Sequence, residues 1–236
     1  MKAMSKFWMA LVVGVAMGVS LFWATPAKAV DLSNTAITWA QFMSWVNDAD
    51  ANGVPDYDPL YPPETVPFDF AGTIFPDGFV FTAVYPGAGT AAGKWVYVYQ
   101  VQLLSPSDIA GLNGMSWVWI ENPSLAGVGG VTSFKITSGS PTIGFGLGSV
   151  DITDADWLPH PVNPTADFDF SPGPGETTYI FGLFSTLPPT KIDATLRDAV
   201  SQTLRPLIYT PSPEPSAFLL LGLGLMGVTI WRRRRL

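Results

Sequence analysis

The sequence predicts an all-β body, an antiparallel β-sandwich, with a short helix in front of it and an apolar helix at each end of the chain. Three observations predict this fold class. From Phe68 onward apolar and polar residues alternate with period two, which is typical of half-buried strands. The 23 glycines and 22 prolines interrupt these runs at short intervals, as turns do. Past residue 60 no run has conspicuous helical spacing, which disfavours a βαβ fold.

The N-terminal segment, residues 1–29, has the parts of a secretory signal peptide. Two lysines stand in front of an uncharged apolar run over residues 7–24. Ala27 and Ala29 then satisfy the small-x-small rule, so we expect signal peptidase to cut before Val30. The apolar run is long for a signal peptide, and an uncleaved anchor helix is the alternative.

Residues 30–66 are expected to form a short helix followed by a curled loop. Four apolar side chains have the spacing i, i+3, i+4, i+7 of one helix face, namely Trp39, Phe42, Met43 and Val46. Thr38 and Gln41 have the spacing of a capping box, in which each side chain accepts a hydrogen bond from the other's backbone amide. We therefore expect the helix to begin after Thr38 and to pack its aromatic face into the core.

The helix leads into the pattern D-x-D-x-N-G-x-x-D, which is typical of a calcium-binding loop. Oxygen-bearing side chains at every second residue converge as such a loop curls, the glycine permits the sharp turn, and a backbone carbonyl supplies a further ligand. Hard oxygen ligands without sulfur or nitrogen select Ca²⁺ over transition metals. The expected ligands are Asp48, Asp50, Asn52, the carbonyl of Val54, and Asp56.

This loop resembles those of EF-hands and, more closely, the calcium repeats of thrombospondin type 3. It departs from the EF-hand at the twelfth position, where Pro59 replaces the bidentate glutamate and Asp58 is an imperfect substitute. The prolines that follow do not permit an exiting helix. There is one copy, whereas type 3 repeats occur in arrays. A turn rich in Asp, Asn and Gly that binds no ion is the alternative.

Residues 67–205 are expected to form the sandwich, of the immunoglobulin-like or jelly-roll-like kind. The candidate strands are Phe79–Tyr85, Trp95–Leu104, Ser116–Glu121, Ser133–Thr137, Thr142–Leu147, Thr165–Phe170 and Thr178–Ser185. The run from Trp95 is the clearest, because one of its faces is apolar throughout and should point to the core. That face carries Trp95, Tyr97, Tyr99, Val101 and Leu103, and the other carries Val96, Val98, Gln100 and Gln102.

The charge distribution excludes nucleic acid as a partner. The chain carries −7 overall, but its basic residues gather at the two ends. Between residues 30 and 231 only five cations stand against all 19 acids, which leaves a net charge of −14. Such a body lacks the cations that would release the counterions of nucleic acid or of anionic lipid.

The chain offers little for catalysis. It has no cysteine, and its one histidine, His160, lies between two prolines, with no G-x-S-x-G elbow for a serine nucleophile. Trp117 and Trp119 share a strand face and would form a platform for sugar stacking, although alternating aromatics usually pack inside. A set of aspartates offers the paired carboxylates of a glycoside hydrolase. These are Asp151, Asp154, Asp156, Asp167 and Asp169. Asp in turns and solvated faces is the commoner explanation, and we expect no enzyme.

The C-terminus carries three signals in order. A proline-rich linker is expected over residues 206–216, and it contains Pro213, Glu214 and Pro215. Residues 217–231 are apolar and uncharged, and as a helix they span about 22 Å, short of the roughly 30 Å hydrocarbon core. Four arginines follow and belong on the cytoplasmic side, namely Arg232, Arg233, Arg234 and Arg235. We expect a transmembrane helix with an arginine cluster over residues 217–236.

These three parts resemble the sorting tail of PEP-CTERM proteins, which Gram-negative bacteria export. The resemblance implies cleavage near Pro213 to Pro215 by the membrane peptidase exosortase. It also implies transient anchoring in the inner membrane, followed by release to the cell surface or the extracellular space. It covers residues 212–236 and concerns sorting, not the activity of the body. An ordinary single-span anchor is the alternative.

Three functions are open for the body. The sorting tail and the acidic composition favour a structural or adhesive protein in an exopolysaccharide or biofilm context. A Ca²⁺-dependent carbohydrate-binding module, with extracellular polysaccharide as its partner, is the second. A carboxylate-based glycoside hydrolase is the third.

Overall fold

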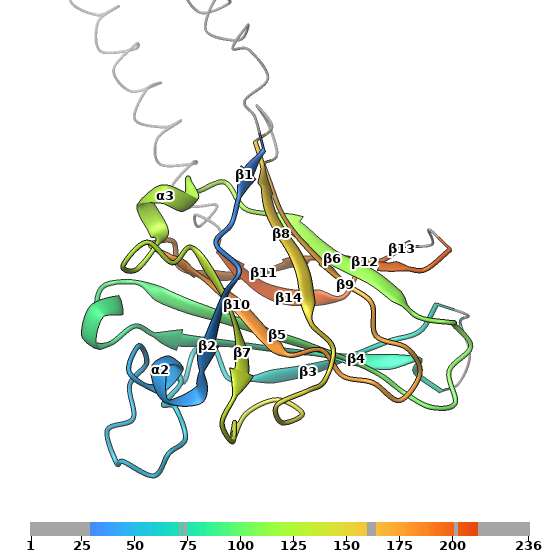
Figure 1. The fold of residues 1–236 in the computed structure, drawn as a ribbon, viewed down its shortest axis with the longest axis horizontal. Coiled ribbons are helices and arrows are strands. Elements are labelled where there is room, and N and C mark those ends of the chain that lie inside the picture. Colours follow the sequence, from blue (N-terminus) through green and yellow to red (C-terminus); the bar gives the residue numbers. More distant parts are fainter. Residues whose placement is uncertain (1–28, 71, 73–74, 160–163, 201–202, 212–236) are drawn as a thin grey trace, which may run out of the picture.

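The computed structural model describes residues 29–70, 72, 75–159, 164–200 and 203–211 (Figure 1). These residues form two six-stranded sheets and a separate two-stranded sheet. The expected all-β sandwich is therefore confirmed. The expected signal peptide up to residue 28, His160, and the tail from Ser212 onward lie outside the described residues. Over the described ranges, no helix is both long and apolar enough to cross a membrane.

One sheet, called the central sheet below, is buried on both faces over its middle strands. Its strands, in spatial order, are β2 (Thr35–Thr38), β7 (Ser133–Ser138), β10 (Ile180–Ser185), β5 (Trp95–Leu103), β4 (Gly78–Pro86) and β3 (Glu64–Phe68). Neighbouring strands are antiparallel, except that β2 runs parallel to β7. The sheet is therefore mixed at one edge, where the sequence predicted only antiparallel pairing.

The second sheet, called the outer sheet, has one face on the core and one face toward solvent. Its strands, in order, are β1 (Val30–Asp31), β8 (Ile152–Leu158), β9 (Thr165–Phe170), β6 (Leu112–Val118), β12 (Thr195–Asp198) and β13 (Thr203–Leu204). All its pairs are antiparallel. Along β9, buried Ala166, Phe168 and Phe170 alternate with partly exposed residues, as expected for a strand with one wet face.

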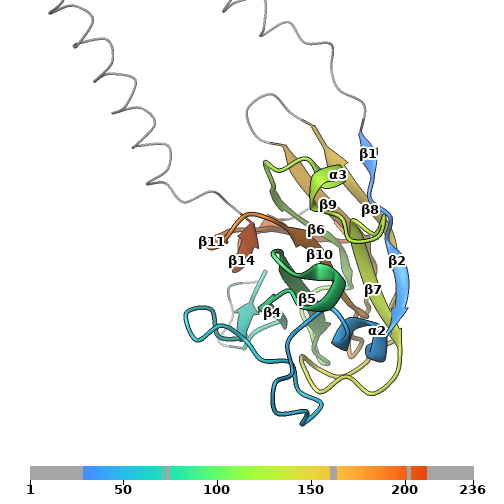
Figure 2. The same ribbon diagram turned by 90° about the vertical axis from the view of Figure 1, so that its left-hand side faces the viewer.

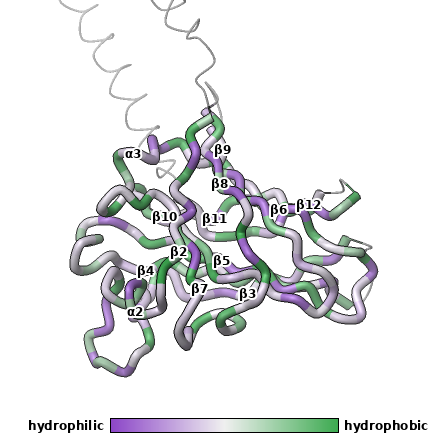
Figure 3. The backbone as a smooth tube through the Cα atoms, in the orientation of Figure 1, coloured by the Kyte–Doolittle hydropathy of each residue, from purple (hydrophilic) through white to green (hydrophobic). Residues whose placement is uncertain are grey.

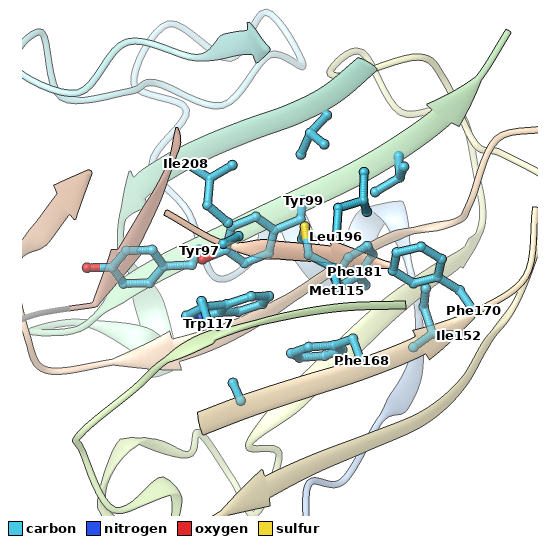
Figure 4. Packing of buried hydrophobic residues seen from close by; sticks show 14 of the residues in the cluster. Tyr97, Tyr99, Met115, Trp117, Ile152, Phe168, Phe170, Phe181, Leu196 and Ile208 are labelled. Carbon is cyan, nitrogen blue, oxygen red and sulfur yellow. The ribbon is translucent and has the colours of Figure 1, made fainter. Parts of the chain in front are cut away.

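The main core lies between the two sheets and is rich in aromatic rings (Figure 4). Tyr99 of β5 packs on Trp117 of β6, with ring centroids 4.6 Å apart. Trp117 in turn stacks on Phe168 of β9 at 5.2 Å. The expected inward face of β5 is confirmed, since its tyrosines, valine and leucine are all fully buried. Such ring pairs contribute about 0.5–1.5 kcal/mol each beyond their buried area.

A second core covers the opposite face of the central sheet, which the sequence did not predict. Val96 and Val98 of β5 are fully buried there, under α2 (Trp39–Met43) and the segment 143–147. Gln100 is also fully buried, and it is satisfied because its Nε2 donates to the carbonyls of Gly146 and Thr178 at 2.8 and 2.9 Å. The polar face of β5 is therefore a core face.

The short helix α2 begins as predicted. The Thr38 hydroxyl accepts from the amide of Gln41 at 3.1 Å, and the Gln41 side chain accepts from the amide of Thr38 at 2.8 Å. The helix ends at Met43, so Val46 lies beyond it. Val46 is nevertheless buried, because it pairs with Gly87 next to β4.

The strand expected over Ser116–Glu121 instead runs over Leu112–Val118 as β6, and strand β8 was not predicted. Two further segments have another structure than predicted. The segment 142–147, expected as a strand, is a loop, because Gly144 and Gly146 have φ of +63° and +85°, which a strand does not allow. The first part of the expected linker at 206–216 is a strand, β14 (Leu207–Pro211), which pairs with β11 (Pro189–Asp193). This two-stranded sheet packs on β4 and β5 and lies on the opposite side of the body from β1 and β2 (Figure 2).

Candidate functional site

The expected calcium loop is curled so that its acidic side chains face its own backbone amides. The amide of Asn52 donates to Asp48 Oδ1 at 3.1 Å and to Asp50 Oδ1 at 3.2 Å. The amide of Gly53 donates to Asp48 Oδ2 at 3.1 Å, and Gly53 has a φ of +79°. The glycine is therefore required by the left-handed backbone at the turn.

The far end of the loop closes through Asp56. Its Oδ2 accepts from the amide of Ala49 at 2.8 Å and from Asn47 Nδ2 at 3.1 Å, and its own amide donates to the Asn47 carbonyl at 2.7 Å. The side chains of Asp48 and Asp50 thus accept from the amides of residues 52–53, and that of Asp56 accepts from the amide of Ala49. Because each carboxylate oxygen has about two acceptor sites, a bond to an amide leaves room for a cation.

A larger acidic site, called the acidic face, lies on the solvent side of the outer sheet. It consists of Asp31, Asp154, Asp156, Asp167 and Asp169, from β1, β8 and β9. The register sets Asp156 between Asp31 and Asp167, and sets Asp154 opposite Asp169. Figure 3 shows hydrophilic residues along β8. Because side chains directly opposite on one sheet face lie about 5 Å apart, the carboxylates form a ladder of like charge.

Three of these carboxylates converge. One oxygen each of Asp31, Asp154 and Asp156 lies within 4.8 Å of the others, and among the described residues this trio alone meets that measure for a metal-binding group. The aspartates of the 48–56 loop do not form such a group of three. Three carboxylates in this arrangement have the chemistry to hold a hard divalent cation such as Ca²⁺.

Arg197 of β12 balances the inner part of the acidic face. Its Nη1 and Nη2 donate to the two oxygens of Asp167 at 3.1 and 2.9 Å, and Nη2 also donates to Asp169 at 2.8 Å. The guanidinium fits because residue 114 is glycine, where a Cβ would lie 2.5 Å from Nη2. A bidentate arginine pair is stronger and more directional than a lysine pair at the same place.

Two pKa values report the crowding on this face. Burial, followed by the charges of Asp154, Asp31, Asp167 and Asp169, raises the pKa of Asp156. Burial and the charge of Asp167 likewise raise the pKa of Asp169, although Arg197 opposes this rise. Both carboxyl groups therefore hold their protons more tightly in the folded chain than in the unfolded chain.

The structure separates the aspartates that the sequence grouped together. Asp151 is not on the acidic face but forms an ion pair with Lys135 at 2.6 Å. Asp31 and Arg197, which sequence reasoning did not select, complete the site from distant parts of the chain. The only signal for Arg197 was that it is one of five cations in a body of 19 acids.

The tryptophans that were considered as a sugar-stacking platform pack inside, as alternating aromatics usually do. Trp117 is 3 % exposed and Trp119 is fully buried, so neither ring is available to a sugar. The backbone of Trp119 is also fixed by Trp157, whose indole N–H donates to the Trp119 carbonyl at 2.9 Å. Aromatic residues alternating on a strand have packed inside, which is their usual place.

The deciding observation on sorting comes from comparison with known families. The family model of the PEP-CTERM protein-sorting motif matches residues 213–235. The chain carries a PEP-CTERM protein-sorting motif. The motif supports an exported protein that exosortase processes and that the C-terminal region anchors transiently in the membrane. Neither the curated proteins nor the solved structures contain a match to this chain.

Proposed function

We propose that this PEP-CTERM protein reaches the cell surface or extracellular matrix of a Gram-negative bacterium and has a structural or adhesive role there, in an exopolysaccharide or biofilm context. Signal peptidase removes residues 1–29, and exosortase cuts near Pro213, Glu214 and Pro215 while residues 217–231 lie in the inner membrane. The single observation that carries the proposal is the sorting motif at the end of a folded acidic sandwich.

Features of the body support a structural role. The aromatic side chains are used mainly to pack two cores, and the acidic face is braced by Arg197. The excess of negative charge keeps such a body soluble outside the cell. The proposal assigns no catalytic residue to the chain.

The experiment follows the full chain in its host, with and without the exosortase gene. Mass spectrometry of the exported chain should find Val30 as the first residue and a C-terminus near Pro215. Replacing Arg232 to Arg235 by alanine should leave the tail uncut, whereas the matched change Arg205→Ala, at an exposed position in the body, should not. Full-length chain outside the cell, or identical processing in the strain without exosortase, would contradict the proposal.

A second candidate function is Ca²⁺-dependent binding of an extracellular polysaccharide. The observation that favours it is the curled loop, in which the carboxylates of Asp48, Asp50 and Asp56 already accept hydrogen bonds from backbone amides of the same loop. Isothermal titration of the chain with CaCl₂ should give heat that Asp50→Asn abolishes and that Asp193→Asn, at an exposed remote site, leaves unchanged. A glycan array with and without chelator then tests sugar binding. Absence of Ca²⁺ heat at millimolar concentration would remove this candidate.

A further inference from the structure

Strand β14 ends two residues before the first proline of the sorting motif. All five residues of β14 pair with β11, and the last pair is Pro211 opposite Pro189. Only Ser212 separates this pair from Pro213. Since a strand advances about 3.3 Å per residue, the motif begins within about 7 Å of the folded body.

β14 is held to the body by its side chains and its backbone. Ile208 is fully buried and Tyr209 is 4 % exposed, both in the main core. The hydroxyl of Tyr99 donates to the Tyr209 carbonyl at 2.8 Å, and the Tyr209 amide donates to the Thr82 hydroxyl at 3.3 Å. These contacts bury the strand that a peptidase would meet first on the upstream side of the motif.

The side chain of Tyr209 also makes polar contacts with Glu64 and Lys191. Its hydroxyl donates to Glu64 at 3.3 Å, and the ammonium of Lys191 lies 5.1 Å from the ring centroid. Lys191 also pairs with Glu64 at 2.5 Å, so β11, β14 and β3 are tied at one point. Fraying of β14 from its C-terminal end therefore breaks several contacts together.

Peptidases bind their substrates as extended chain, and segments inside a sheet are cut only after they open. Downstream of the motif, Ser216 alone separates Pro215 from the apolar run. The segment 212–216 spans at most about 18 Å, whereas a body of this size is roughly 40 Å across. If the tail is anchored as proposed, the tether between the folded body and the membrane is therefore shorter than the body is wide.

We propose that β14 is a latch that limits processing: while it is docked, a membrane peptidase can bind only one residue upstream of Pro213, and cleavage of the folded chain is coupled to release of β14. This inference rests on the proposed processing by exosortase and adds the regulation of that same site.

The experiment uses the full chain and measures its cleavage rate in membranes that contain exosortase. A spacer of twelve Gly and Ser residues inserted after Pro211 should raise the rate at least fivefold. The same spacer between Gly129 and Gly130, an exposed turn where an added Cβ meets nothing within 4 Å, is the matched control and should leave the rate unchanged.

A reversible lock tests the same latch without loosening the fold. Thr190 and Thr210 are register partners on β11 and β14, and the chain has no cysteine of its own. The pair Thr190→Cys and Thr210→Cys can therefore form one cross-strand disulfide. Oxidation should slow cleavage at least fivefold and reductant should restore it, while reductant should not change the wild-type rate.

The outcomes separate the two proposals. A wild-type chain that exosortase does not cut overturns the proposed function. Suppose that exosortase cuts the wild-type chain. The latch alone is overturned if the spacer leaves the cleavage rate unchanged or lowers it, and if the oxidised and reduced double-cysteine variants are cut at the same rate.

Discussion

Arg197 offers the sharpest test of how the outer sheet tolerates its acidic face. The change Arg197→Met keeps most of the side chain's apolar stem but removes the guanidinium. It therefore deletes three hydrogen bonds to Asp167 and Asp169, at 2.8 to 3.1 Å. Asp167 and Asp169 are then left without their cation. Burial, and after it the charge of neighbouring carboxylates, already raises the pKa values of Asp156 and Asp169.

The magnitude follows from exposure. An exposed ion pair contributes about 0.2–1 kcal/mol, whereas breaking a buried pair costs about 3–5 kcal/mol. The side chain of Arg197 is 29 % exposed, and those of Asp167 and Asp169 are 21 % and 50 % exposed. The site lies between the two limits, so Arg197→Met should lower the free energy of unfolding by about 2 kcal/mol. For a body of this size that corresponds to a fall in Tm of roughly 4–8 °C.

The assay is urea denaturation of the purified chain followed by tryptophan fluorescence, at low and high salt. Arg205→Met, at an exposed position, is the control and should change stability by less than about 0.5 kcal/mol. In a background of Asp167→Asn and Asp169→Asn the cost of Arg197→Met should fall below about 1 kcal/mol. If that cost is the same in both backgrounds, the ion pairs do not stabilise the sheet and the reasoning is wrong.

Three further predictions concern the body. Asp156→Asn should stabilise the chain by about 0.5 kcal/mol at neutral pH by relieving repulsion between like charges. Because the pKa of Asp156 is raised in the folded state, this gain should vanish as the pH falls below the ordinary value of 3.8, which denaturation over pH 3–8 measures. Glu121→Ala should cost about 2 kcal/mol, since it strips the acceptor from Thr186, whereas Glu121→Gln, which retains one, should cost less by the same assay. Gly182→Ala should cost at least about 3 kcal/mol of unfolding free energy, because its Cβ would lie 2.1 Å from the Tyr97 carbonyl oxygen; a cost under 1 kcal/mol would show that β10 shifts freely.

Local patterns predicted some elements well. The capping box at Thr38 and Gln41 is present because both partners lie within one turn of chain. The inward face of β5 was predicted because period-two alternation is built into a strand. The same alternation misled on the other face, where Gln100 looked solvent-facing. Burial of Gln100 required a second layer, brought by residues more than 40 positions away.

Prolines explain the error at the C-terminal side of the body. Pro206 and Pro211 suggested a linker, because a proline does not donate to a ladder in the middle of a sheet. In the structure Pro211 is the last residue of β14, at the end of the β11–β14 ladder, where proline is tolerated. Ile208 and Tyr209 hold this strand to the body, and their burial depends on packing against β4 and β5.

The two candidate sites also differ in how far the sequence predicted them. The 48–56 loop is local, and its curled form was predicted from nine residues, while its binding of Ca²⁺ stays a prediction. The acidic face was predicted in part, because Asp167 and Asp169 alternate along one strand. Asp31 joins Asp154 and Asp156 across more than 120 residues, and only strand register brings them within 4.8 Å.

The sequence alone determined the sorting motif, the excess of acid and the β-rich pattern. Each of these depends on composition or on residues close together in the chain, and not on how distant segments pair. The tertiary structure decided which carboxylates meet, that the middle strands of the central sheet are buried on both faces, and that β14 is docked just ahead of the motif. These depend on pairing between segments far apart along the chain, where a shift of one residue in register turns every side chain to the other face.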